Sequence, residues 1–146
     1  MPETIYTIPI NEAFDACKTS EKPECPFCRL ENDLEKNEID LILGASMMEP
    51  DIRIKTNKSG FCSDHFRKMM AYGKRLPLAL MLESHLNEIY GDVTKKDKPL
   101  PPDKAVKRLS ELASSCYVCD RMNYNYIRIM SNAAYMWTVD DDFRAR

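Results

Sequence analysis

Six cysteines and one histidine have the types and spacing that suit a metal site. The cysteines are Cys17, Cys25, Cys28, Cys62, Cys116 and Cys119. Four of them form two Cys-x2-Cys pairs, and Cys62-Ser-Asp-His65 has the same spacing with a histidine as its last member. Zinc binds four thiolate or imidazole ligands at tetrahedral corners, and each pair of this spacing can supply two of them.

The spacing favours one ligand set, which consists of Cys25, Cys28, Cys62 and His65. Cys62 and His65 share one face at an expected helix start, where the helix dipole favours a thiolate. Three thiolates and one imidazole leave no open coordination position, which is typical of structural zinc rather than catalytic zinc. We therefore expect one zinc ion per chain, and iron fits this donor set less well.

Cys116 and Cys119 have no assigned partners in that set. They are interpreted first as a second metal half-site that lacks its other ligands. A disulfide, a site that bridges two chains, or an exchange of ligands with the first site are the alternatives. The other histidine, His85, lies next to an apolar helix face and is expected to pack there.

Two catalytic interpretations of these residues are considered. Cys25-Pro-Phe-Cys28 matches the thiol redox motif of glutaredoxin-like proteins, but that motif follows a β-strand and the residues before Cys25 are polar. A Cys62–His65 hydrolase lacks a third group to orient the histidine. The sequence thus shows no catalytic constellation and predicts no enzyme, with a Cys25/Cys28 redox protein kept as an alternative.

Composition restricts the class of protein. The chain has 146 residues, of which 44% are hydrophobic and 30% charged, as in globular domains. The longest apolar run, Leu76 to Leu82, is too short to span a membrane, and the N-terminus has no secretion signal. Paired cysteines without a secretion signal predict a cytoplasmic protein with reduced thiols.

The small net charge of −2 hides an uneven distribution. Residues 1–50 carry 4 basic and 11 acidic side chains, whereas residues 51–110 carry 13 basic and 7 acidic ones. A nucleic-acid-binding regulator that uses the basic segment 53–75 is therefore an alternative function. Its phosphate contacts would come from Arg67, Lys68, Lys74 and Arg75. The competing interpretation is that these cations neutralise the acidic part within the fold or across a homodimer.

Apolar periodicity predicts an all-α chain. Helices are expected over about 11–17, 28–48, 62–72, 77–91, 103–116 and 122–137, with a short one near 140–142. Residues 51–58 fit either a short helix or an extended piece. Residues 92–102, with three prolines and three lysines, are the expected linker.

A shift of 91 residues aligns Cys25 with Cys116, Cys28 with Cys119, and Asp51-Ile52-Arg53 with Asp142-Phe143-Arg144. The same shift places partners of Cys62 and His65 beyond Arg146. We therefore expect two related halves, with an N-terminal zinc-binding half at 1–91 and an incomplete C-terminal half-repeat at 103–146. The natural chain would then continue past Arg146.

These motifs resemble an uncharacterised bacterial family of unknown function. The resemblance rests on Cys25-Pro-x-Cys28, Gly60-Phe61-Cys62-x-x-His65-Phe66 and Cys116-x-Val-Cys119, together with the opening stretch 6–14. It implies that Cys25, Cys28, Cys62 and His65 form one metal set and that Cys116 and Cys119 begin another. Members of that family continue into a second Gly-aromatic-Cys-x-x-His, and no activity comes with the resemblance.

The sequence thus predicts an all-α, zinc-stabilised helical bundle built from two related halves, the second incomplete. Its expected function is that of a zinc-binding interaction or scaffold module in the bacterial cytoplasm, with a protein partner or a second copy of itself.

Overall fold

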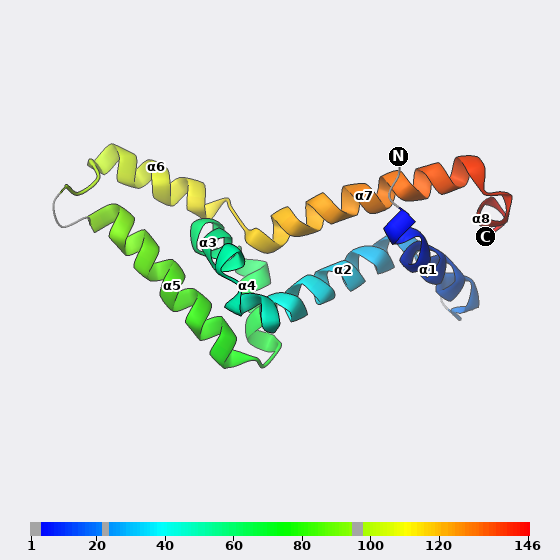
Figure 1. Cartoon of the computed structure of the whole chain (residues 1–146), viewed down its shortest axis with the longest axis horizontal. Helices are drawn as coiled ribbons and strands as arrows, with labels where there is room; N and C mark the ends of the chain where they lie inside the picture. The colour runs from blue at the N-terminus through cyan, green and yellow to red at the C-terminus, as the bar shows by residue number, and fades with distance from the viewer. Residues whose placement is uncertain (1–3, 22–23, 95–97) are drawn as a thin grey trace. The chain divides into compact units, whose positions relative to one another are not determined.

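The computed structural model describes residues 4–21, 24–94 and 98–146. In these residues the chain forms eight α-helices and two 3-10 helices and contains no strand (Figure 1). The prediction of an all-α fold is confirmed. In chain order the elements are η1 (Thr4–Tyr6), α1 (Thr7–Thr19), α2 (Pro26–Ile42), η2 (Ala45–Met48), α3 (Pro50–Ser59), α4 (Ser63–Ala71), α5 (Arg75–Thr94), α6 (Pro102–Ala113), α7 (Tyr117–Val139) and α8 (Asp141–Arg144).

Prolines account for the starts of two helices, α1 and α3. Pro9 lies in the first turn of α1, where a missing N–H removes no intrahelical hydrogen bond, so α1 begins before the expected Asn11. Pro50 occupies the first turn of α3, and the ambiguous segment 51–58 is helical. Residues 92–94 of the expected linker belong to α5, Pro102 begins α6, and residues 95–97 lie outside the described residues.

The chain divides into two compact units, and their boundaries fall within helices rather than at the expected linker. The first unit combines residues 1–37 with residues 121–146, and the second is the continuous segment 38–120. Part of α2 and part of α7 therefore belong to each unit.

The core of the first unit brings together side chains from its two chain segments. Phe143, only 2% exposed, lies at its centre, with its ring centroid 4.8 Å from that of Phe14 and 6.5 Å from that of Trp137. Asp140 caps α8 by accepting a hydrogen bond from the backbone N–H of Phe143 at 2.9 Å. The buried members of this cluster are Ile10, Ala13, Leu30, Ile129, Ala133, Met136 and Phe143.

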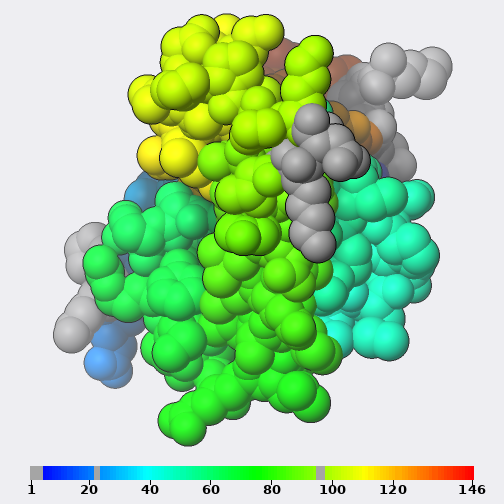
Figure 2. Space-filling view, turned by 90° about the vertical axis from the view of Figure 1, so that its left-hand side faces the viewer, coloured from blue at the N-terminus to red at the C-terminus, as the bar shows by residue number. Residues whose placement is uncertain are grey.

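The second unit is built from α3, α4, α5 and α6 together with the adjoining ends of α2 and α7. Helix α3 packs on α5 and on η2, and α4 also contacts α5. Figure 2 looks onto this unit from the side of α5, with α6 above it. The most deeply buried side chains are Leu43, Thr56, Met69, Leu78, Met81 and Val118. Cys62 and His65, which follow α3, thus lie in the same packed unit as Cys116 and Cys119 at the start of α7.

Replacing Phe143 with alanine should lower the free energy of unfolding by about 3–5 kcal/mol, because it removes a buried ring from the core of the first unit. Val139→Ala is the matched control on the same part of the chain, since Val139 is 59% exposed, and should change that free energy by about 0.5 kcal/mol or less. Urea unfolding measures both. Equal losses in the two variants would contradict the described packing.

Candidate metal centre

Cys62 and His65 lie at the start of α4. Cys62 is the N-cap residue, in an extended conformation, and its carbonyl accepts the first helical hydrogen bond from Phe66 N–H at 2.9 Å. His65 follows within the first turn and is buried. The expected helix start at this position is confirmed.

Cys116 and Cys119 occupy the equivalent positions at the start of α7. The carbonyl of Cys116 accepts a hydrogen bond from Asp120 N–H at 3.0 Å, which begins the helix. Cys116 is buried and Cys119 remains exposed. Two helix N-termini thus present one ligand pair each, and the positive end of each helix dipole favours anionic sulfur.

The four side chains converge on one point, with every ligand atom within 4.8 Å of the others. Nδ1 of His65 lies 3.2 Å from Sγ of Cys62, 3.4 Å from Sγ of Cys116 and 3.3 Å from Sγ of Cys119. Sγ of Cys62 lies 3.9 Å from Sγ of Cys119.

These separations match those of a tetrahedral zinc site. With bonds of about 2.3 Å to sulfur and about 2.05 Å to nitrogen, tetrahedral angles place two sulfurs about 3.8 Å apart and sulfur about 3.6 Å from nitrogen. The distance between the sulfurs of Cys62 and Cys119 agrees with that value, and the sulfur–nitrogen distances are shorter by a few tenths of an ångström. Three cysteines and one histidine in the described residues could therefore hold a metal ion.

The thiols of this group differ in acidity. Burial raises the pKa of Cys119 to about 12, and hydrogen bonding to Cys116 acts in the same direction. Burial also acts to raise the pKa of Cys62, but hydrogen bonds from the backbone N–H of His65 and from the thiols of Cys116 and Cys119 outweigh it, so this pKa is lowered. Because metals bind thiolates, an incoming cation would have to displace the proton of Cys119.

A second set of contacts joins the two segments that carry the ligands, residues 59–65 and residues 115–119. The carbonyl of Gly60 accepts a hydrogen bond from Tyr117 N–H at 3.0 Å, and that of Ser59 accepts one from Ser115 Oγ at 2.6 Å. Each bond joins the end of α3 to the residues around Cys116. The two segments that carry the ligands are thus connected by hydrogen bonds outside the ligand group as well as by the contacts among its sulfur and nitrogen atoms.

His85, on α5, contacts the end of α3 beside these hydrogen bonds. The expectation that it packs rather than binds metal agrees with its position, since it is buried and lies outside the ligand group. Its Nδ1 lies 2.6 Å from the carbonyl oxygen of Asn57, and because a carbonyl can only accept, Nδ1 carries the proton and donates. Gly60, at φ +62°, lies against the same imidazole, and a Cβ there would come within 2.7 Å of the ring.

The structure combines the predicted ligands differently from the sequence analysis. Cys62 and His65 are grouped with Cys116 and Cys119, whereas Cys25 and Cys28 lie in the other unit, at the start of α2. The group of four in the described residues therefore does not include Cys25 or Cys28. Every Cys-x2-Cys pair in this chain begins a helix, so spacing alone offers no means of choosing between the two pairs.

Cys25 and Cys28 form an exposed thiol pair. The backbone N–H of Cys28 donates to Sγ of Cys25 at 3.4 Å. That bond, together with a bond from the Cys28 thiol, lowers the pKa of Cys25. The pKa of Cys28 is raised, because its thiol donates to Cys25 and lies beside the negative charge of that sulfur. Within the described residues no third cysteine, histidine or carboxylate joins this pair.

Two of the four basic residues predicted to contact nucleic acid have acidic partners. Arg67 pairs with Asp64 at 3.3 Å, and Lys74 pairs with Asp40 at 2.7 Å. Asp40 also accepts a hydrogen bond from Tyr72 at 2.9 Å. Lys68 lies in α4 and Arg75 begins α5. The Lys74–Asp40 pair supports the alternative in which these cations neutralise the acidic residues 1–50, whereas Asp64 belongs to the basic segment itself.

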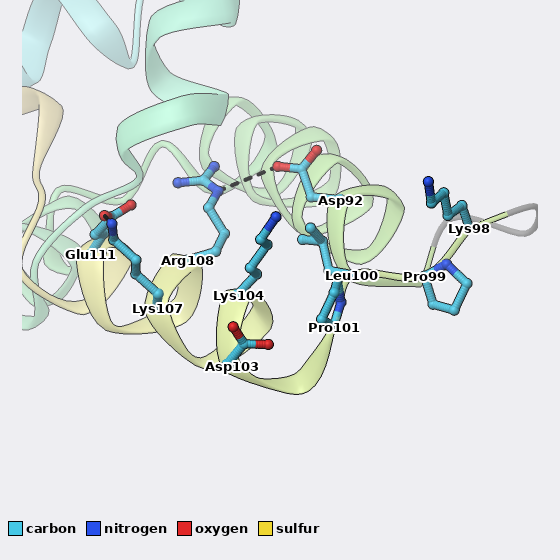
Figure 3. A pocket seen from close by; sticks show the side chains of 10 residues that line it. All are labelled: Asp92, Lys98, Pro99, Leu100, Pro101, Asp103, Lys104, Lys107, Arg108 and Glu111. Atoms are coloured by element: carbon cyan, nitrogen blue, oxygen red, sulfur yellow. Dashed lines mark hydrogen bonds and ion pairs between the residues drawn. The ribbon is translucent and has the colours of Figure 1, made fainter.

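A pocket where the end of α5 faces α6 is lined by charged side chains of both signs (Figure 3). Arg108 points across it to Asp92, with Nε 3.3 Å from Oδ2. The same guanidinium donates to the carbonyl of Lys58 at 3.4 Å. The guanidinium of Arg108 thus already has two partners within the protein.

Fold and ligand group together define an all-helical protein with a potential metal centre of three cysteines and one histidine. A model of a family of unknown function (DUF6062) matches residues 1–146, and the chain belongs to that family. Neither proteins of curated function nor solved structures gave a match. None of the helices in the described residues is long and apolar enough to cross a membrane.

Gly60→Ala should destabilise the protein more than Gly73→Ala. Both glycines have positive φ, but an alanine at 60 would also press on His85, whereas the space around Gly73 is open. The expected losses in free energy of unfolding are about 3 kcal/mol for Gly60→Ala and about 1 kcal/mol for Gly73→Ala. Urea unfolding of the two variants measures the difference, and equal losses would exclude a close contact between Gly60 and His85.

Proposed function

We propose that this protein is a zinc-stabilised helical module in which Cys62, His65, Cys116 and Cys119 hold one structural zinc ion. The observation that carries the proposal is the close grouping of one imidazole nitrogen and three sulfurs, with every ligand atom within 4.8 Å of the others. Thiolates and imidazole at this geometry favour zinc over cations that prefer oxygen ligands. Four protein ligands leave no position for a substrate or an activated water, so the ion acts on the fold.

The zinc ion would fix the relative positions of two helix starts that are distant in sequence. The two ligand pairs are separated by the rest of α4, by α5 and by α6, so binding of one ion would close a long loop of the chain. Such a closure restricts the unfolded chain, and the binding energy of the ion becomes folding energy. The hydrogen bonds between the end of α3 and the start of α7 would then be strengthened by the same link.

The surface of the second unit supports a role in protein interaction. Several large apolar side chains on α5 and α6 are exposed, including Leu86 at 62%, Tyr90 at 70% and Val106 at 63%. Leu86, Tyr90 and Leu109 line one apolar hollow there. Exposed apolar patches of this kind commonly mark binding surfaces. We therefore assign the module a scaffold or interaction role, in the cytoplasm where thiols stay reduced.

Substitution of the ligands tests this assignment. Cys62→Ser and Cys116→Ser should each remove the tightly bound zinc equivalent and lower the melting temperature by about 10 °C or more, since about 3 kcal/mol or more of folding energy is lost. Zinc content after desalting in a reducing buffer, together with thermal unfolding, measures both effects.

The matched control is the double variant Cys25→Ser/Cys28→Ser. It removes two thiols of the same spacing at another helix start, and it should keep that zinc equivalent and its melting temperature. Loss of the tight zinc in this control, with retention in Cys116→Ser, would show that the ligand set predicted from the sequence is the correct one.

A further inference from the structure

The pair Cys25 and Cys28 repeats the local structure of the pair Cys116 and Cys119. Each first cysteine directly precedes a helix, α2 at Pro26 and α7 at Tyr117. Each accepts the first helical hydrogen bond on its carbonyl at 3.0 Å, from Arg29 N–H in one case and from Asp120 N–H in the other. The second cysteine of each pair lies within the first turn.

The equivalence extends beyond the cysteines. Helices α2 and α7 begin 91 positions apart, and α3 and α8 also begin 91 positions apart, at Pro50 and Asp141. Glu49 and Asp140, which precede these two short helices, are both N-cap residues in extended conformation. The register first seen in the sequence therefore also aligns helix starts in the structure.

From this equivalence we propose that Cys25 and Cys28 are half of a second zinc site, which is completed by the same two cysteines of a second copy of this chain. The inference rests on the proposed function, because it transfers to Cys25 and Cys28 the ligand role assigned to Cys116 and Cys119. Both thiols are exposed and can reach another molecule.

The number of ligands that the described residues supply favours a contribution from a second chain. Structural zinc needs four ligands, and in the described residues only Cys62, His65, Cys116 and Cys119 form a group of three or more. A second copy related by twofold symmetry presents the same two thiols from the opposite side. Together the two pairs make a set of four cysteines, which is a common composition of structural zinc sites.

An apolar surface next to the thiol pair favours a second copy as the partner. Phe27, which lies between the two cysteines, lines a hollow together with Phe14, Met130 and Trp137 of the same unit. Met130 is 40% exposed and Trp137 is 54% exposed. A twofold contact at the thiol pair would bring these apolar surfaces close to each other and could remove them from water.

Zinc titration under reducing conditions tests the proposal, with zinc as the only added ligand. The protein with one tightly bound zinc is titrated while bound zinc is measured, and sedimentation gives its mass. We expect about half an additional equivalent per chain, since one ion would be shared by two chains, and a zinc-dependent change from monomer to dimer. Cys25→Ser/Cys28→Ser should bind no additional zinc and stay monomeric.

Three results would overturn the inference: no additional zinc, a full additional equivalent on a monomer, or a zinc-dependent dimer that persists in Cys25→Ser/Cys28→Ser. These outcomes are separable from failure of the proposed function, which would appear as absence of the first equivalent from the unaltered protein. Cys62→Ser provides the reverse comparison, because it should lose the first equivalent and still form the zinc-dependent dimer if it folds. If it does not fold, the comparison of the unaltered chain with the Cys25→Ser/Cys28→Ser variant decides the question.

Discussion

The convergence of one imidazole nitrogen and three sulfurs is the constraint on which the second unit of this protein depends. Nδ1 of His65 lies within 3.4 Å of all three sulfurs, although the ligand pairs begin two helices far apart in the sequence. Without a cation, three cysteines this close to one another could not all be thiolates at low cost, because their negative charges would repel at short distance. A bound zinc ion, as proposed here, would convert that repulsion into attraction and link the two helix starts.

The surrounding residues show how the polypeptide positions this group before any ion is considered. Gly60 adopts a positive φ that lets the chain turn from α3 into the ligand loop, and the imidazole of His85 lies where a side chain would otherwise be. Backbone and side-chain hydrogen bonds then connect Ser59 and Gly60 to Ser115 and Tyr117. The segment that carries the candidate ligand Cys62 is therefore already restricted by its packing on His85 of α5.

The sequence predicted the helical class, most helix positions and the residue types of the ligand group. Those predictions succeeded because apolar periodicity, capping residues and the x2 spacing are local properties of the chain. The partner of Cys62 and His65 was not predictable in the same way, because two equivalent cysteine pairs begin helices at Pro26 and Tyr117 and only tertiary packing distinguishes them. The division into compact units likewise depends on tertiary packing, because its boundaries fall inside α2 and α7.

X-ray absorption spectroscopy of the zinc-loaded Cys25→Ser/Cys28→Ser variant tests the central claim most directly. That variant contains one candidate site, so the averaged spectrum reports on the group of three cysteines and one histidine alone. We predict three sulfur ligands at about 2.3 Å and one nitrogen ligand at about 2.0–2.1 Å. A first shell with two or fewer sulfurs, or one dominated by oxygen, would contradict the assignment of Cys62, His65, Cys116 and Cys119 as a structural zinc site.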